Sequence, residues 1–127
     1  MKPPVLVVDD DPNIRATAIS LLTHRGYQVV EAEDGTDCLE RAQAGFRGVI
    51  LMDIMMPKQD GWSTIRAMVR EDLTRGSLIC MLTVIRAPGS AGEGLEGAVF
   101  DYLPKPFDGD ELMAMVDNAA AQLAEAG

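Results

Sequence analysis

Short apolar runs alternate with longer amphipathic segments along this chain. The apolar runs are four or five residues long and rich in Val, Ile and Leu: Val5–Val8, Tyr27–Val30, Gly48–Met52, Leu78–Leu82 and Val99–Leu103. A nearly continuous apolar run is typical of a strand that is buried on both faces, as in a parallel sheet. The runs therefore predict five strands of one parallel sheet.

The segments between these runs carry apolar residues at helical spacing. The expected buried helix faces are Ile14, Ala18, Leu21 and Leu22; Cys38, Leu39 and Ala42; Trp62, Ile65, Met68, Val69 and Leu73; and Leu112, Met115, Val116, Ala119 and Leu123, with Trp62 partly exposed. Asp34 and Asp108 are expected N-caps, and Gly26 is expected to end the first helix. Strands that alternate with helices predict an α/β domain with helices on both faces of the sheet.

The segment from Arg86 to Ala98 occupies the place of a fourth helix, but its composition is poor for a helix. It reads RAPGSAGEGLEGA, with four glycines and a proline near its start. Each interior glycine costs about 0.8–1 kcal/mol relative to alanine, so that four cost roughly 3–4 kcal/mol. We expect a fourth helix that is short, distorted or mobile.

Length and charge restrict the class of protein. The 127 residues fit one domain, expected to span 1–127, and 47% hydrophobic residues suffice for a core. The net charge of −9 argues against direct nucleic-acid binding, since phosphate contacts need clustered Lys and Arg. No apolar run is long enough for membrane insertion, and the N-terminus lacks the pattern of a signal peptide. The two cysteines lack the spacing of metal ligands and are expected to be buried thiols in a reducing compartment. A cytoplasmic protein is expected.

Polar side chains follow four of the predicted strands, at the edge where a parallel sheet binds its ligands. They are Asp9, Asp10 and Asp11 after the first strand, Asp53 after the third, Thr83 after the fourth and Lys105 after the fifth. Converging carboxylates raise one another's pKa unless a cation neutralises them, and oxygen ligands suit Mg²⁺ or Mn²⁺. A divalent ion beside an attackable carboxylate and a lysine is suited to phosphoryl transfer.

The motifs VVDDDP, LMDIMMPKQDGW, LT and YLPKPF occur in this order along the chain. With them the chain resembles, over essentially its whole length, the response-regulator receiver domain of two-component signalling. The resemblance implies a flavodoxin-like (βα)5 fold with strand order 2-1-3-4-5. It implies a switch that accepts a phosphoryl group from a histidine kinase or a histidine phosphotransfer protein and acts on a downstream protein target. Such a domain catalyses only its own phosphoryl transfer and dephosphorylation, so it is not expected to be an enzyme.

The resemblance also assigns roles to the acidic residues. Asp53 resembles the phosphoacceptor. The magnesium ion is expected to be bound directly by Asp10, by Asp53 and by the backbone carbonyl of Met55, and by Asp9 mainly through water. Asp11 is read differently, from its position before Pro12: it is expected to be the N-cap of the helix that Pro12 begins.

Three further residues resemble the phosphoryl-binding and switch groups of the family. Lys105 resembles the lysine that pairs with Asp53 and then with the phosphoryl oxygens, and its bond to Pro106 is expected to be cis. Thr83 resembles the hydroxyl that hydrogen-bonds the phosphoryl group. Tyr102 resembles the aromatic switch that turns inward into the space that Thr83 leaves.

Three positions depart from the family's pattern. Met55 and Ile85 lie two residues after Asp53 and Thr83, where members of the family often have polar groups near the path of the hydrolytic water. Apolar side chains at these positions predict slow hydrolysis of the acyl phosphate. Val84 stands where the family usually has a small residue, and it is expected to slow small phosphodonors.

Two alternatives stay open at this point. The spacing of Asp9 and Asp11 matches the D-x-D motif of haloacid dehalogenase-type phosphatases, in which Asp9 would be the nucleophile. The site of acyl phosphorylation separates this class from the receivers.

Because the chain starts at Met1, a preceding domain is not expected. The protein is then either a stand-alone receiver or a receiver excised from a larger regulator.

Overall fold

The computed structural model describes residues 2–56, 60–83 and 94–126. Five parallel strands form one sheet in the order β2-β1-β3-β4-β5, which confirms the predicted topology. The strands are β1 (Val5–Val8), β2 (Val29–Ala32), β3 (Val49–Asp53), β4 (Leu78–Thr83) and β5 (Val99–Pro104). The central strands β1 and β3 are buried along their whole length, as their continuous apolar runs predict.

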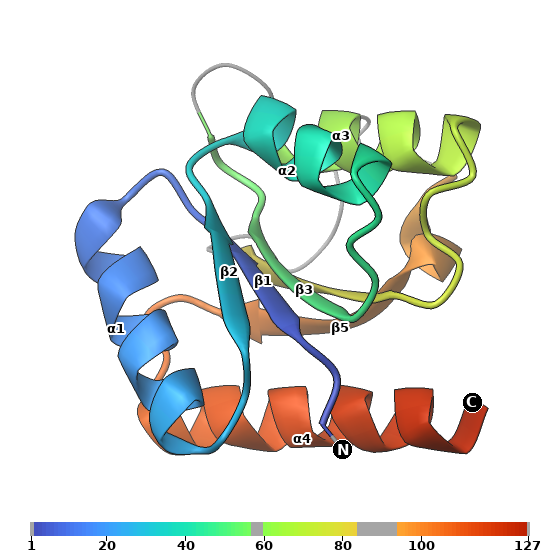
Figure 1. Ribbon diagram of the computed structural model, residues 1–127. Coiled ribbons are helices and arrows are strands. Elements are labelled where there is room, and N and C mark those ends of the chain that lie inside the picture. Colours follow the sequence, from blue (N-terminus) through green and yellow to red (C-terminus); the bar gives the residue numbers. More distant parts are fainter. Residues whose placement is uncertain (1, 57–59, 84–93, 127) are drawn as a thin grey trace.

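Helices cover both faces of this sheet (Figure 1). They are α1 (Pro12–His24), α2 (Gly35–Gln43), α3 (Gly61–Arg70) and α4 (Gly109–Ala126). Helices α1 and α4 pack on one face against a core that includes Val5, Leu51 and Leu82. Helices α2 and α3 pack on the other face against Leu6 and Ile50, among others. Because alternate strand residues point to opposite faces, one apolar run supplies both cores.

Aspartate side chains cap the helices. Asp11 Oδ1 accepts from the backbone N–H of Asn13 at 2.9 Å, and Pro12 is the first residue of α1, as predicted. Asp34 caps α2, which was also predicted. Asp108 and Glu111 form a reciprocal capping box at the start of α4, with N···O distances of 2.8 and 3.1 Å. Three short signals in the sequence thus locate three helix starts.

Gly26 ends the first helix as predicted. Its φ of +93° lies in the left-handed region that favours glycine, and its N–H donates to Thr23 O at 3.0 Å. The next strand, however, begins two residues later than predicted. The N–H of Tyr27 donates to Leu22 O at 3.1 Å, so the backbone of Tyr27 belongs to the turn that ends the helix and not to the strand ladder.

The third helix corrects two further predictions. Trp62 is 3% exposed and packs in the core between α2, α3 and the sheet, so it is buried and not partly exposed. Val69 is 45% exposed, because the buried face of α3 runs through Trp62, Ile65 and Met68 and leaves Val69 beside it. Leu73 packs against this core from beyond the end of the helix.

The weak fourth helix was predicted over a segment of which residues 86–93 lie outside the described part of the chain. Of the described remainder, Glu96–Ala98 form a short 3-10 helix before β5. Within the described residues, no helix is both long and apolar enough to cross a membrane.

Candidate functional site

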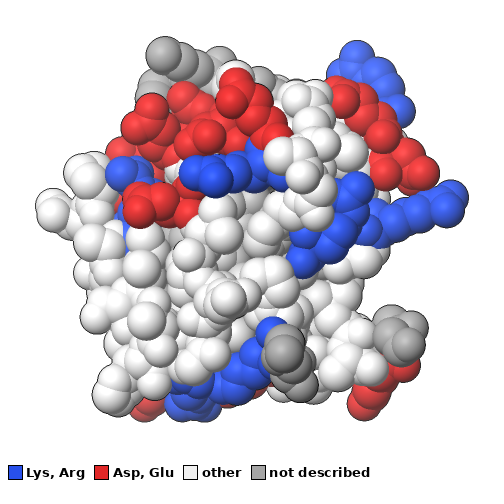
Figure 2. Space-filling model, viewed as in Figure 1, with Lys and Arg blue, Asp and Glu red and all other residues white. Residues whose placement is uncertain are grey.

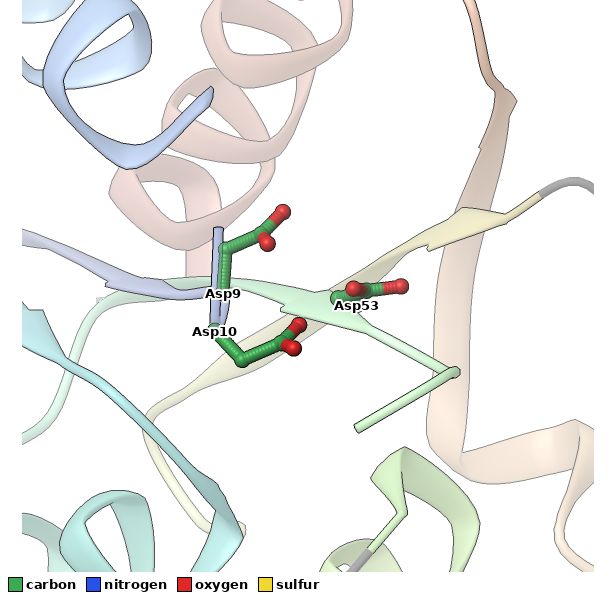
Figure 3. Close-up of side chains that lie close together, drawn as sticks. All are labelled: Asp9, Asp10 and Asp53. Carbon is green, nitrogen blue, oxygen red and sulfur yellow. The ribbon is translucent and has the colours of Figure 1, made fainter. Parts of the chain in front are cut away.

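Three carboxylates meet at the carboxyl ends of two neighbouring strands. Asp9 and Asp10 follow β1, and Asp53 is the last residue of β3. Each of the three offers an oxygen atom that lies within 4.8 Å of the others. Figure 3 shows the side chains of Asp9 and Asp10 extending to the side on which Asp53 lies. The sheet topology, which makes β1 and β3 neighbours, therefore joins two motifs that are far apart in the sequence.

The three carboxylates differ in their surroundings. Asp9 is fully buried, and both of its oxygens accept hydrogen bonds: Oδ1 from the N–H of Asp11 at 2.9 Å and Oδ2 from Lys105 Nζ at 3.0 Å. Asp53 is 5% exposed, whereas Asp10 is exposed to solvent. Asp10 is thus the member of the cluster that an ion from solution reaches first.

Lys105 supplies the positive charge of the site. It directly follows β5, its Nζ lies 3.3 Å from Asp53 Oδ2, and its side chain is 16% exposed. Burial by itself lowers the pKa of Lys105, but the hydrogen bond that Lys105 donates to Asp9 and the charges of Asp53 and Asp9 outweigh this effect and raise the pKa. Lys105 therefore stays an ammonium group. The peptide bond from Lys105 to Pro106 is cis, in agreement with the prediction.

Burial and the neighbouring charge of Asp9 raise the pKa of Asp53 to about 6, against the opposing effects of Lys105 and of the Met55 N–H, which donates to Asp53 Oδ1 at 3.1 Å. Three carboxylates around one ammonium group leave an excess of negative charge. A cluster of oxygen donors with such an excess fits a hard divalent cation such as Mg²⁺. The residues present therefore suit the expected metal.

The remaining predicted site residues are only partly described. Thr83 ends β4 and lies opposite Pro104 in the register, at the same edge of the sheet. Tyr102 is half-buried in β5, and its ring centroid lies 6.3 Å from that of Trp62. Met55 is 60% exposed beside Asp53. Val84 and Ile85 lie outside the described residues.

Two residues of the site were not foreseen from the sequence. Arg15 Nη1 donates to the backbone carbonyl of Asp9 at 2.7 Å. Gly61 begins α3 so close to β3 that an added Cβ would lie 2.8 Å from Asp53 O. The sequence contains a signal for each residue. Arg15 lies one turn into the helix that follows the acidic run. Gly61 follows Asp60, the N-cap of α3, whose side chain accepts a hydrogen bond from the N–H of Ser63 at 2.7 Å.

Comparison with known proteins agrees with this geometry. The family model for the response regulator receiver domain matches residues 5–117. The phosphate regulon transcriptional regulatory protein PhoB of Escherichia coli is 35% identical over 112 residues, which are 88% of this chain and 49% of PhoB. The DNA-binding dual master transcriptional regulator RpaA of Synechocystis is 33% identical over 90% of this chain and 47% of its own length. The chain thus spans about half the length of these curated relatives.

Solved structures show the same fold. A CheY-like response regulator receiver domain protein from Methanospirillum hungatei superposes with a TM-score of 0.93 at 38% identity, covering 98% of this chain and 99% of that one. The response regulator TrrA from Thermotoga maritima, in complex with Mg²⁺ and BeF, has a TM-score of 0.75 at 28% identity, covering 92% of this chain and 98% of that one.

These comparisons and the acidic pocket do not favour the phosphatase alternative. Asp9, its expected nucleophile, is fully buried, whereas the pocket of Asp9, Asp10 and Asp53 fits the phosphoacceptor site of a receiver. The fold is flavodoxin-like, and the chain belongs to the response regulator receiver domain family of two-component signalling.

Proposed function

We propose that Asp53 accepts the phosphoryl group in a magnesium-dependent reaction. The observation that carries this proposal is the arrangement of the buried Asp53 carboxylate, with Asp9 and Asp10 within 4.8 Å and Lys105 Nζ at 3.3 Å. With a pKa of about 6, Asp53 is mostly ionised near neutral pH and so available as a nucleophile. A phosphoacceptor of this kind is a signalling module and not an enzyme that turns over a separate substrate.

The metal site proposed here uses Asp10 and Asp53 as direct ligands. The backbone carbonyl of Met55 would be the third protein ligand, and the fully buried Asp9 would contact the ion through water. Bound Mg²⁺ (or Mn²⁺) would screen the negative charge that a phosphoryl group brings to the site. The Mg²⁺ and BeF in the TrrA structure support this proposal.

The residues of this chain then act as follows. An Asp53 oxygen attacks the phosphorus atom of the donor's phosphohistidine in line, a P–O bond forms, the P–N bond breaks, and the imidazole leaves with the bonding electron pair. The ammonium group of Lys105 balances charge on the transferred oxygens. Thr83 hydrogen-bonds the phosphoryl group, and Tyr102 turns inward in response. The contact between Tyr102 and Trp62 connects this movement to the core on one face of the sheet.

The donor in this proposal is a histidine kinase or a histidine phosphotransfer protein, and the output is a protein target. Acidic side chains gather on the upper part of the face shown in Figure 2, and Glu33, Asp34, Asp37 and Glu40 line a shallow depression beside α2. With the net charge of −9, this supports the proposal that residues 1–127 form one domain that binds no nucleic acid itself. A longer regulator with a separate DNA-binding part, as the names of the relatives suggest, is compatible with it.

The cytoplasm is the proposed location. Both cysteines are free and buried in cores on opposite faces of the sheet, as suits a reducing compartment. We also propose slow loss of the phosphoryl group, because the exposed, apolar Met55 offers no group that orients a water molecule. The sequence predicts the same effect for Ile85, whereas Val84 is expected to slow small phosphodonors. Met55→Asn is expected to shorten the lifetime of the acyl phosphate.

Acetyl phosphate with Mg²⁺ tests the proposal directly. Intact mass measurement should show one phosphoryl group on the wild-type protein and none on Asp53→Asn or after chelation of the metal. Borohydride trapping followed by peptide mapping should place the group on Asp53. A phosphoryl group on Asp9 would instead restore the phosphatase alternative, and an unmodified wild-type protein would contradict the proposal as a whole.

A further inference from the structure

Arg15 connects the acidic site to two neighbouring elements. It lies in α1, its Nη1 donates to the backbone carbonyl of Asp9 at 2.7 Å, and its Nε donates to Glu31 Oε1 in β2 at 2.9 Å. The Arg15 side chain is 16% exposed, against 58% for Glu31, so the guanidinium group is largely enclosed. One side chain thus joins α1, the end of β1 and β2 at the edge of the sheet that carries the site.

The contact falls on one of the two peptide groups that flank Asp10. The carbonyl of the Asp9–Asp10 peptide accepts from Arg15, and the N–H of the Asp10–Asp11 peptide donates to Asp9 Oδ1 at 2.9 Å. The backbone of Asp10 is therefore held from both sides, while its side chain remains exposed at the metal site. Removal of the hydrogen bond from Arg15 therefore releases the Asp9–Asp10 peptide group, while the Asp10–Asp11 peptide group stays bound to Asp9.

The geometry of the contact requires arginine. A guanidinium group presents its N–H donors in a rigid planar fork, so that Nε can bind Glu31 while Nη1 binds the Asp9 carbonyl. A lysine ammonium group carries the same charge on a flexible stem without this fork. Replacing arginine by lysine therefore separates the geometry of the contact from its charge.

We propose that Arg15 is a positioning residue for the magnesium site, which orients Asp10 through the backbone of Asp9. The inference rests on the proposed function, because it assumes that Asp10 is a metal ligand. Positioning and electrostatics have opposite consequences here. Arg15 is a positive charge beside an acidic cluster, so its removal should strengthen cation binding if only charge matters. If Arg15 orients the ligand, its removal should weaken cation binding.

Magnesium binding to the unphosphorylated protein, measured by isothermal titration calorimetry, separates these effects. Arg15→Gln is expected to raise the Kd for Mg²⁺ about 10-fold, the lower end of the range found when groups that orient metal ligands are removed. Arg15→Lys is expected to raise the Kd at least as much, because it loses the planar fork while its retained positive charge gives no electrostatic gain that offsets the loss. The control is Arg25→Gln. Arg25 lies just beyond the other end of α1, where it forms an ion pair with Asp117. The Kd of this variant for Mg²⁺ should equal that of the wild type.

A second measurement requires no metal. Amide hydrogen exchange of Asp10 and Asp11 should be faster in Arg15→Lys than in the wild type, while amides in β3 keep their protection. An unchanged Kd in Arg15→Lys, or tighter binding in Arg15→Gln, overturns the positioning role and leaves the proposed function intact. A wild-type protein that binds no Mg²⁺ overturns the proposed metal site itself, and this inference with it.

Discussion

Lys105 binds Asp9 at least as closely as it binds the proposed phosphoacceptor: its Nζ lies 3.0 Å from Asp9 Oδ2. The corresponding distance to Asp53 Oδ2 is 3.3 Å. The resemblance assigned Lys105 to Asp53, and the structure adds a fully buried second partner. One ammonium group thus neutralises part of the charge of two buried carboxylates. The stability of the folded protein should therefore depend on Lys105, on bound metal and on pH.

Lys105→Met should destabilise the metal-free protein. It leaves Asp9 and Asp53 buried without their cation, and removal of one partner of a buried pair costs roughly 3 kcal/mol. Urea unfolding near pH 7.5 should show this loss, and saturating Mg²⁺ should restore part of it by supplying another cation. Arg75→Met is the control, because Arg75 forms an exposed pair with Asp72. Equal effects of the two variants would contradict the role of Lys105.

Asp53→Asn should have the opposite effect in the absence of metal. A carboxyl group with a raised pKa stabilises the fold fully below about pH 4, and this contribution is lost as the pH rises through about 6. The asparagine side chain does not ionise, so the variant should be more stable than the wild type at pH 7.5 by roughly 3 kcal/mol. Urea unfolding between pH 4 and pH 8, with EDTA, measures the difference.

Two controls accompany this prediction. Glu125→Gln removes one negative charge from an exposed position far along α4 and controls for the change in net charge. Addition of Mg²⁺ should stabilise the wild type and not Asp53→Asn, because a ligand that binds only the folded state raises its stability. An Asp53→Asn variant that is less stable than the wild type at pH 7.5 would contradict the prediction. It would show that Lys105 stabilises the Asp53 carboxylate by more than burial and the charge of Asp9 destabilise it.

Most of the fold was predictable because its signals are local. Apolar runs locate strands, aspartates locate helix starts, and the parallel topology then brings the strand ends together. The contacts within the site were less predictable, because they depend on how side chains pack across long sequence separations. Lys105 reaches Asp9 across 96 positions, and Arg15 reaches Glu31 across 16. The burial of Trp62 was misjudged for the same reason, since its neighbours come from other elements.

Gly61→Ala should disturb both the fold and the site. An added Cβ would lie 2.8 Å from Asp53 O and 2.9 Å from Met81 Cε, so α3 or the end of β3 must shift. Crowding of this kind costs about 1–3 kcal/mol. We expect that loss in urea unfolding, together with a higher Kd for Mg²⁺. Gly97→Ala is the control, since among the described residues no atom beyond Gly97 and its two chain neighbours lies within 4 Å of its Cβ position. Similar losses in both variants would contradict the steric explanation.

Tyr27→Phe should weaken the attachment of α4 to the end of α1. The Tyr27 hydroxyl donates to Asp117 Oδ1 at 2.6 Å, and Arg25 Nη2 lies 2.6 Å from Asp117 Oδ2. Loss of the first bond should cost roughly 1–2 kcal/mol, because Arg25 remains as a partner. Urea unfolding of both proteins at pH 8 measures this cost.

The same variant tests the titration of Tyr27. Burial, followed by the hydrogen bond and charge of Asp117, raises the pKa of Tyr27 far above 10, so its contribution to stability is complete below about pH 10 and is lost as the pH rises further. The advantage of the wild type over Tyr27→Phe should therefore shrink between pH 10 and pH 11. A constant difference across this range would count against the raised pKa.

Trp62 should report the proposed movement of Tyr102. Trp62 is the single tryptophan, it is 3% exposed, and its ring lies 6.3 Å from that of Tyr102 at an interplanar angle of 46°. Beryllofluoride added to the Mg²⁺-loaded protein should change the fluorescence of Trp62, because an inward turn of Tyr102 alters the surroundings of the indole. In Tyr102→Leu the change should fall to less than about half, since the moving ring is absent while the phosphoacceptor site is intact. Asp53→Asn should give no response. A full response in Tyr102→Leu would show that the signal reaches Trp62 by another route, and the switch role of Tyr102 would then be wrong.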